Sequence, residues 1–332
     1  MWKSINRRHL QNQISLFSHN KIRKSQQTSS LTSNRTVTLS KVFLSTIMAN
    51  DQDDIARYFE FAKNLTLEAG KFIKNDNKLE KIVKSKTIET DLVTNFDNKI
   101  EEFLFKSLIK EYPDHKFIGE EKTGQSKLSE LTDAPTWIID PIDGTVNFVH
   151  SFPEFCISVG LSICKEIVLG IIYNPSNCEL YTAKKGQGAF LNGEPIRVSN
   201  VTELKKTMLA YETGSVKMFK ERDIAVGRLL ALFDACQAVR NIGSAALSLA
   251  YVAKGVIDCF QMDGLQPWDV AAGMLIVTEA GGTLLDSKGG PFNLMKPDTV
   301  AACKTQLACE VTKLLVDTDL KTRRQRLQHM KH

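Results

Sequence analysis

The chain has 332 residues, of which 42% are apolar and 24% charged, and these values are typical of globular proteins. Residues 1–50 hold eight Lys or Arg and no acidic residue, so the 35 basic and 38 acidic residues that follow give a net charge of −3. This balance speaks against a nucleic-acid partner. No apolar run approaches the roughly 20 residues that span a bilayer, so a membrane partner is not expected either.

Residues 1–50 are rich in Ser, Asn, Gln and basic residues, a composition that resembles a mitochondrial transit segment. The alternative is a disordered extension, with translation of a shorter form starting at Met48. The seven cysteines include no C-x-x-C pair, so neither a disulfide framework nor a zinc ribbon is indicated, and a reducing compartment fits. We therefore predict a cytoplasmic protein, or a mitochondrial one if residues 1–50 act as a transit segment.

The change of composition along the chain predicts three parts: the extension 1–50, a folded domain over 51–318 and a basic, solvated tail over 319–332. Apolar residues at helical spacing predict helices over 54–73, 100–109, 219–235, 245–253 and 270–280. Short apolar runs between turn residues predict strands at 157–163, 167–173, 180–183, 188–191, 283–285 and 300–302. Helices packed on sheets are the expected architecture.

An acidic run follows the apolar stretch Trp137–Ile139, which should be a buried strand. Pro141 fixes its own φ and Gly144 permits a tight turn, so Asp140 and Asp143 can converge on one point. Carboxylate clusters of this kind suit Mg²⁺, which keeps water and phosphate oxygens as its remaining ligands. The alternative interpretation is an Asp-rich surface turn.

Two further acids strengthen the metal interpretation. Glu120 follows the apolar pair Phe117-Ile118, and Asp269 stands where a helix N-cap is expected, before a long apolar helix. An exposed glutamate pair at 120–121 and a simple capping aspartate are the alternatives. Thr145 could begin another helix, whose free N–H groups would form an anion site beside the acids.

These motifs together resemble the inositol monophosphatase family, over about residues 54 to 302. The stretch from Trp137 to Phe148 reads WIIDPIDGTVNF, with GEE upstream and PWDVAAGMLIVTEAGG downstream. The resemblance implies an α/β layered fold, an αβαβα sandwich of alternating helix and sheet layers, and a homodimer. It also implies Mg²⁺-dependent, lithium-sensitive hydrolysis of a small phosphate monoester by a metal-activated water, without a covalent intermediate.

The resemblance also implies a set of metal ligands. Glu120, Asp140 and the Ile142 carbonyl would hold one Mg²⁺, and Asp140, Asp143 and Asp269 would hold a second. Glu120 would also reach a third, weakly held ion, which gives two to three Mg²⁺ per active site. Two ions can stabilise the attacking and leaving oxygens of a displacement.

The catalytic residues implied by the resemblance are Thr145, Asp97 and Glu120. Asp97 lies in a DLVT-x-x-D motif and would pair with the Thr145 hydroxyl to orient the water; a helix cap near Asn98 is its alternative role. The residues implied to contact substrate are Asp143, Gly144, Thr145, Gly243, Ser244, Ala245, Lys86 and Asp269. For Lys86 the alternative is Lys84 in a shifted register, and for the Gly243–Ala246 loop it is a tightly packed helix start.

Two positions depart from the family pattern: Val146 replaces a threonine, and Met262 stands where an inositol-binding glutamate is usual. A methionine offers only a weak acceptor, although the adjacent Asp263 could substitute in a changed backbone register. The leading hypothesis is hydrolysis of myo-inositol 1-phosphate to inositol and phosphate. A broader sugar-phosphate or 3′(2′),5′-bisphosphate nucleotide phosphatase is the runner-up, and a non-catalytic protein that binds metal or ligand is the third.

Overall fold

The computed structural model describes residues 53–74, 83–85, 92–123, 130–212 and 222–329. The chain divides into two compact units, residues 1–54 and 55–332, and almost every described residue belongs to the second. The transit-like segment 1–50, Lys86 and the predicted helical residues 219–221 lie outside the described residues. None of the helices in the described ranges is long and apolar enough to cross a membrane.

A seven-stranded sheet forms the larger half of this unit, with strand order β3-β4-β5-β6-β7-β8-β9. β3 pairs with β4 in parallel, and all the other neighbours are antiparallel. The strands are β3 (Lys116–Gly119), β4 (Thr136–Asp143), β5 (Cys156–Ile163), β6 (Glu166–Asn174), β7 (Glu179–Lys184), β8 (Ala189–Leu191) and β9 (Glu194–Ile196).

A five-stranded sheet has the order β11-β10-β12-β14-β13. β10 is parallel to both of its neighbours, whereas β14 is antiparallel to both of its own. The strands are β10 (Met208–Tyr211), β11 (Ala238–Arg240), β12 (Cys259–Met262), β13 (Thr283–Asp286) and β14 (Thr299–Ala302). A separate two-stranded ribbon joins β1 (Val83–Ser85) to β2 (Leu92–Thr94).

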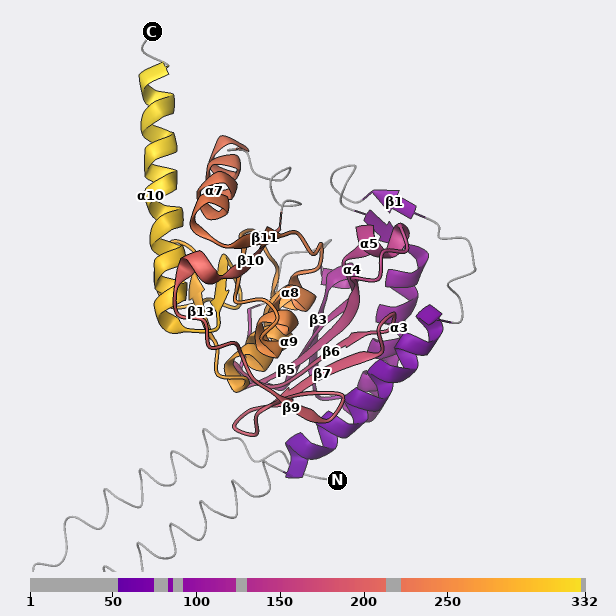
Figure 1. Cartoon of the computed structure of the whole chain (residues 1–332). Coiled ribbons are helices and arrows are strands. Elements are labelled where there is room, and N and C mark those ends of the chain that lie inside the picture. The colour runs from indigo at the N-terminus through magenta and orange to yellow at the C-terminus, as the bar shows by residue number, and fades with distance from the viewer. Residues whose placement is uncertain (1–52, 75–82, 86–91, 124–129, 213–221, 330–332) are drawn as a thin grey trace, which may run out of the picture. The chain divides into compact units, whose positions relative to one another are not determined.

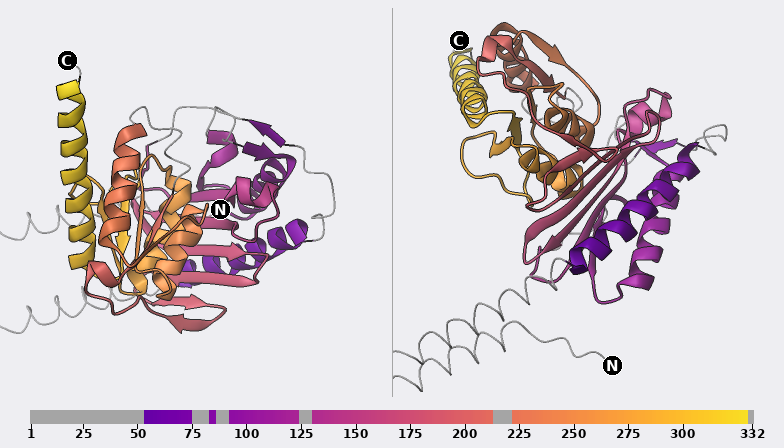
Figure 2. Two further views of the ribbon diagram at one scale, coloured as in Figure 1. Left: turned by 45° about the horizontal axis from the view of Figure 1, so that its top comes forward. Right: turned by 60° about the horizontal axis from the view of Figure 1, so that its bottom comes forward.

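Helices cover both sheets in alternating layers (Figures 1 and 2). The helix over 53–74 and α3 (Asn95–Glu111) pack on one face of the seven-stranded sheet, and α8 (Ala245–Lys254) and α9 (Pro267–Glu279) lie between the two sheets. α7 (Arg222–Ala235) and α10 (Thr305–His329) cover the outer face of the five-stranded sheet. The predicted αβαβα sandwich is therefore confirmed.

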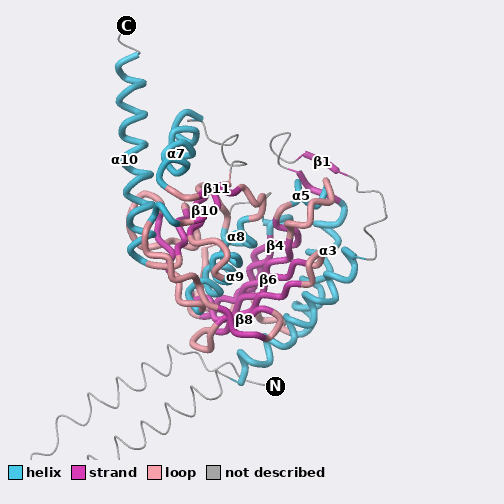
Figure 3. Tube along the Cα trace, viewed as in Figure 1, coloured by secondary structure: helices cyan, strands magenta, loops and turns pink. Residues whose placement is uncertain are grey.

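The sheet interior explains why its strands could be recognised as apolar runs. β5 and β6 are buried along nearly their whole length because helices cover both faces, so these strands lack polar alternation. Figure 3 shows these long strands between the two helical layers. The predicted strands and helices within the described residues are all present, with ends shifted by up to five residues, the largest shift being at the start of α3.

The basic segment expected to be a solvated tail is helical in the structure up to His329, because α10 continues through it. Asp319 receives two hydrogen bonds from Arg228 of α7, and Arg326 donates to Asp223 at the start of α7. The last turns of α10 thus make side-chain contacts with α7.

Candidate metal centre and active site

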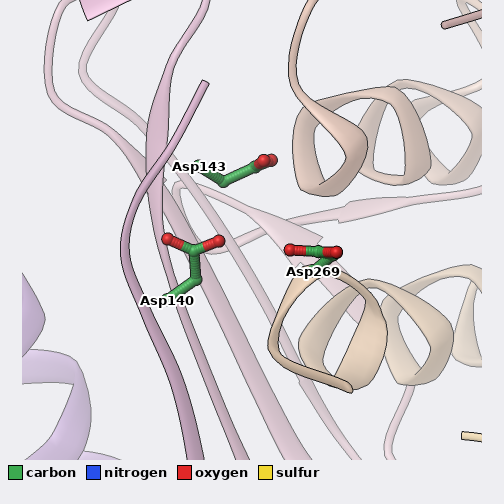
Figure 4. A group of neighbouring side chains, drawn as sticks. All are labelled: Asp140, Asp143 and Asp269. Carbon is green, nitrogen blue, oxygen red and sulfur yellow. The ribbon is translucent and has the colours of Figure 1, made fainter. Parts of the chain in front are cut away.

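Three aspartates from two segments that are distant in sequence meet at one end of the seven-stranded sheet (Figure 4). Asp140 and Asp143 belong to the last residues of β4, and Asp269 to the first turn of α9. One carboxylate oxygen from each residue lies within 4.8 Å of the others. The structure thus brings together the three aspartates that the sequence motifs suggested.

A bulge at the end of β4 explains why Asp140 and Asp143 face the same way. Asp140 pairs with Ser158 and Asp143 with Cys156, so three residue steps on β4 oppose two on β5. Residues three apart in a regular strand point to opposite faces, and one extra residue reverses that relation. Pro141 fits this irregular stretch because it has no N–H to leave unpaired.

Asp143 is held by the N-terminus of α8. Its Oδ2 accepts hydrogen bonds from the Ser244 hydroxyl at 2.5 Å and the Ala246 N–H at 2.7 Å, while Ser244 also caps the helix by accepting from Leu247. Burial raises the pKa of Asp143, and the hydrogen bonds from Ser244 and Ala246 oppose that shift. The Gly243–Ala246 loop is therefore both a helix start and a partner of the acid cluster.

Asp97 and Asp269 occupy the same position in their helices, and it differs from the predicted N-cap. α3 begins at Asn95 with Thr94 as its N-cap, and α9 begins at Pro267 with Gln266 as its N-cap. Each aspartate is the third helical residue, and its Oδ2 accepts the N–H of the capping residue, at 2.8 Å for Asp97 and 2.6 Å for Asp269. The capping predictions were thus wrong by three residues.

At the third helical position, the two oxygens of the carboxylate can have different partners. In a capping box the third residue reaches back with one oxygen to the N-cap backbone, which leaves the other oxygen to face away from the helix. Oδ1 of Asp97 lies 3.3 Å from the Thr145 hydroxyl, so the expected Asp97–Thr145 pair is present. Burial raises the pKa of Asp97 to about 7, against the opposing hydrogen bonds from Thr94.

The turn after β4 places the remaining residues of the acidic run. Gly144 has φ +92°, a conformation that a side chain would strain, and it precedes the five-residue helix α5 (Thr145–Val149). The Thr145 hydroxyl lies 3.1 Å from the Ile142 carbonyl oxygen. A carbonyl oxygen has two lone pairs, so that contact leaves Ile142 able to accept a second partner.

Glu120 begins the four-residue helix α4 (Glu120–Thr123), directly after β3. Burial raises the pKa of Asp140 well above its ordinary value, and the negative charges of Glu120, Asp143 and Asp269 raise it further. Glu120 therefore lies close enough to interact with Asp140, although the group within 4.8 Å consists of the three aspartates. Lys86, the remaining predicted site residue, lies outside the described residues.

The chemistry of these donors fits a hard cation. Within the described ranges, neither Asp140, which is buried, nor Asp143, which is half-buried, forms an ion pair with Lys or Arg. Several buried carboxylates without a positive partner are unfavourable, and oxygen-only ligand sets suit Mg²⁺, Ca²⁺ or Mn²⁺. The cluster could therefore hold a metal ion.

Sequence reasoning missed Glu212, which organises the loop beside Asp143. Glu212 directly follows β10 and is buried; its oxygens accept from the N–H groups of Ile242 at 3.1 Å and Gly243 at 2.8 Å, and from the Ser248 hydroxyl at 3.0 Å. Its sequence signal was an acid after an apolar run, the same pattern that singled out Glu120 and Asp140.

The structure also decides the role of Asp263, which the sequence left open. β12 keeps a regular register against β14 through the pair Met262–Thr299, so no changed register brings Asp263 into the Met262 position. Asp263 is buried and instead accepts from Arg228 at 2.6 Å and from Gln261 at 2.9 Å. The idea that Asp263 replaces the missing glutamate is therefore wrong, because its carboxylate is bound elsewhere.

Comparisons with known proteins agree with this geometry. The profile of the inositol monophosphatase family matches residues 54–318. Human inositol monophosphatase 1 is 41% identical over 255 residues, which cover 76% of this chain and 92% of the relative. An IMPase of Thermotoga maritima superposes with a TM-score of 0.71 at 31% identity, over 80% of this chain and 99% of that one.

A third relative has structures with two different ligands. The IMPase-II of Staphylococcus aureus was solved with inositol monophosphate, at 27% identity and a TM-score of 0.68, and with 2′-AMP, at 28% identity and a TM-score of 0.69. Both structures cover 82% of this chain and 99% of their own. With the family profile covering most of its length, the chain belongs to the inositol monophosphatase family and is a phosphatase.

Proposed function

We propose that the chain hydrolyses an inositol monophosphate, most specifically myo-inositol 1-phosphate, to inositol and phosphate in a Mg²⁺-dependent reaction. The observation that carries this proposal is the convergence of Asp140, Asp143 and Asp269, with the Asp97–Thr145 pair joined to the same acidic run. The names of the relatives supply the substrate class.

Two to three Mg²⁺ ions are proposed as the cofactor. Glu120, Asp140 and the Ile142 carbonyl would hold one ion, Asp140, Asp143 and Asp269 would hold the next, and Glu120 would also serve a third. When bound, such ions polarise a phosphoryl oxygen and lower the pKa of a bound water. The carboxylate-only side chains of the cluster support this assignment.

Asp97 and Thr145 are proposed to orient the attacking water. The Thr145 hydroxyl can donate to Asp97 Oδ1, at 3.3 Å, and its oxygen can then accept a hydrogen bond from water. Thr94 fixes Asp97 by donating from both its N–H and its hydroxyl to Oδ2. The Asp97 carboxylate is thereby held in place beside the Thr145 hydroxyl.

The substrate is proposed to lie between α5 and the start of α8. Gly144, Thr145, Gly243, Ser244 and Ala245 would line it together with Asp143 and Asp269, and Lys86 is retained as a proposed contact. Asn147 supports this arrangement, because its Nδ2 lies 2.9 Å from the Ile242 carbonyl oxygen and 2.6 Å from that of Glu154. One side chain thus ties the loop of α8 to α5.

A second candidate substrate class is favoured by Met262. Without a carboxylate at that position, selection for polyol hydroxyls weakens, and the staphylococcal relative was solved with 2′-AMP as well as inositol monophosphate. A broader sugar-phosphate or 3′(2′),5′-bisphosphate nucleotide phosphatase is therefore the alternative. By family likeness we also propose a homodimer, which analytical ultracentrifugation would test.

The experiment is a phosphate-release assay on inositol 1-phosphate, sugar phosphates and adenosine 3′,5′-bisphosphate, with and without Mg²⁺ and millimolar Li⁺. We expect Mg²⁺-dependent, Li⁺-inhibited turnover with the highest kcat/KM for inositol 1-phosphate. A clear preference for the bisphosphate would overturn the inositol assignment and support the alternative. No turnover of any substrate would favour a non-catalytic metal- or ligand-binding role.

The variant Met262→Glu is expected to raise kcat/KM for inositol 1-phosphate relative to the other substrates, because a carboxylate can accept hydrogen bonds from polyol hydroxyls. Met262→Leu is the matched control, since it preserves an apolar side chain of similar size. Equal substrate ratios for the glutamate and leucine variants would exclude a role for residue 262 in selection.

A further inference from the structure

A second buried carboxylate lies one helical turn after Asp97 on α3. Glu101 is 1% exposed, and residues four apart in a helix lie on the same face. From this face of α3, Asp97 accepts a hydrogen bond from the Thr145 hydroxyl. Glu101 contacts a different element, the short helix α4 that begins with Glu120.

Both oxygens of Glu101 bind the backbone at the start of α4. Oε2 accepts the N–H of Glu121 at 2.8 Å, and Oε1 accepts the N–H of Lys122 at 3.1 Å. The first N–H groups of a helix have no partner within the helix. Glu101 therefore caps α4 by accepting two hydrogen bonds, although it lies about twenty positions earlier in the chain.

Gly119 makes this unusual cap feasible. It precedes α4, where a capping side chain would normally stand, yet glycine has no side chain to offer. A Cβ atom built at Gly119 would lie 2.5 Å from Glu101 Oε2 and 2.5 Å from the Phe105 ring. The missing side chain thus leaves the space that the carboxylate of Glu101 occupies.

We infer that Glu101 is a positioning residue, which holds the first turn of α4 so that Glu120 faces Asp140 at the metal centre. The inference rests on the proposed function, because it assumes that Glu120 serves a metal ion. α4 has only four residues, too few for its own hydrogen bonds to fix it. Its placement therefore depends on β3 before it and on Glu101 across from it.

The test is the variant Glu101→Gln, compared with Glu102→Gln as its matched control. Glutamine has the same length but only one acceptor oxygen, and its amide group would face a backbone N–H. Glu102 is the next residue on α3, is exposed and pairs with Lys106. Both variants remove one negative charge from the same helix, so they differ mainly in the contact with α4.

Two readouts are measured for each protein: the Mg²⁺ concentration that gives half of the maximal rise in Tm, and the Mg²⁺ concentration that gives half-maximal activity. Glu101→Gln should raise both by about tenfold, the usual cost of losing a residue that orients a metal ligand. Glu102→Gln should match the wild type. As a fraction of the wild-type value, the activity of the Glu101 variant should be lower at low Mg²⁺ than at saturating Mg²⁺.

Gly119→Ala provides an independent route if Glu101→Gln does not fold, because the added Cβ displaces Glu101 without removing it. It should raise the Mg²⁺ requirement in the same way. Variants that lower Tm without Mg²⁺ but keep the wild-type Mg²⁺ dependence would overturn the positioning role. If neither the Tm nor the activity of the wild type depended on Mg²⁺, the proposed function would be contradicted, and the inference with it.

Discussion

Two clusters of buried and half-buried acids lie in different parts of this molecule, and their negative charge is balanced differently. Beside α7 and α10, Arg228 binds Asp263 at 2.6 Å and makes two hydrogen bonds of 2.7 Å to Asp319. At the end of β4, Asp140, Asp143 and Asp269 converge, and no Arg or Lys of the described residues pairs with the first two.

The pKa directions follow from this difference. Burial works to lower the pKa of Arg228, but Asp319 and Asp263 hold it above its ordinary value. Burial raises the pKa of Asp140, and Glu120, Asp143 and Asp269 add to that shift instead of opposing it. A cluster that contains its own cation ties elements together, whereas a cluster without one leaves a place for a cation from solution.

The largest expected effect comes from removing a charge from the cluster that lacks a cation. Asp140→Asn should lower kcat for phosphate release by about a thousandfold or more, about 4 kcal/mol of barrier, because Asp140 is central to the proposed ligand set. Asp114→Asn, in the exposed turn after α3, is the control. Activity of Asp140→Asn within tenfold of wild type would contradict the proposed ligand set.

Removing the cation from the other cluster should mainly affect folding. Arg228→Met should lower the free energy of unfolding by about 3–5 kcal/mol, because it removes the guanidinium that binds both Asp263 and Asp319. Urea denaturation measures this change, with the exposed Arg324→Met as control. A loss below about 1 kcal/mol would mean that water or rearrangement satisfies the two acids.

Stabilisation by Mg²⁺ should also differ between variants of the two clusters, by a smaller free energy. At a hundred times its dissociation constant, the ion should stabilise the wild type by about 2.7 kcal/mol if it binds only the folded chain. The variant Arg228→Met should retain most of that gain, and Asp140→Asn should lose it. Thermal unfolding in a Mg²⁺ series checks both, and an equal response of the two variants would place the ion elsewhere.

The smallest expected effect is on the pH dependence of stability, and it comes from His115, which belongs to neither acid cluster. Burial lowers the pKa of His115, whose Nδ1 accepts a hydrogen bond from Trp137 Nε1 at 3.0 Å. Its contribution to stability is therefore complete above the ordinary value near 6.5 and is lost as the pH falls through the lower folded pKa. A tenfold difference in proton affinity between the folded and unfolded states corresponds to a loss of about 1.4 kcal/mol.

His115→Gln should reduce the slope of unfolding free energy against pH below 6.5, because glutamine can accept the same hydrogen bond without titrating. Urea denaturation at several pH values measures that slope. An unchanged slope in the variant would assign the acid-side loss of stability to other groups.

The sequence by itself determined the layered fold and the acidic residues of the site. Strands such as β5 are apolar on both faces because helices cover both, so they are visible as continuous runs. Acids such as Asp140 and Glu120 were visible because they end such runs. Long ordered motifs also carried the family resemblance, which the comparisons confirm.

Local patterns misplaced the helix starts at Asp97 and Asp269, since an aspartate favours both the N-cap and the third helical position, and sequence spacing alone did not separate them. Only the folded structure resolved this ambiguity, because each carboxylate accepts a hydrogen bond from the N–H of the N-cap residue, which identifies the aspartate as the third helical residue.

The tertiary structure alone decided the partners of the remaining acids. Asp263 looked available beside Met262, yet Arg228, distant in sequence, binds it. Glu101 lies in no motif, and the apolar run before Glu212 does not reveal its partners, because both bind backbone N–H groups of remote segments. A backbone N–H is the same in nearly every residue, so the sequence holds no complementary pattern for such contacts, and only folding places donor and carboxylate together.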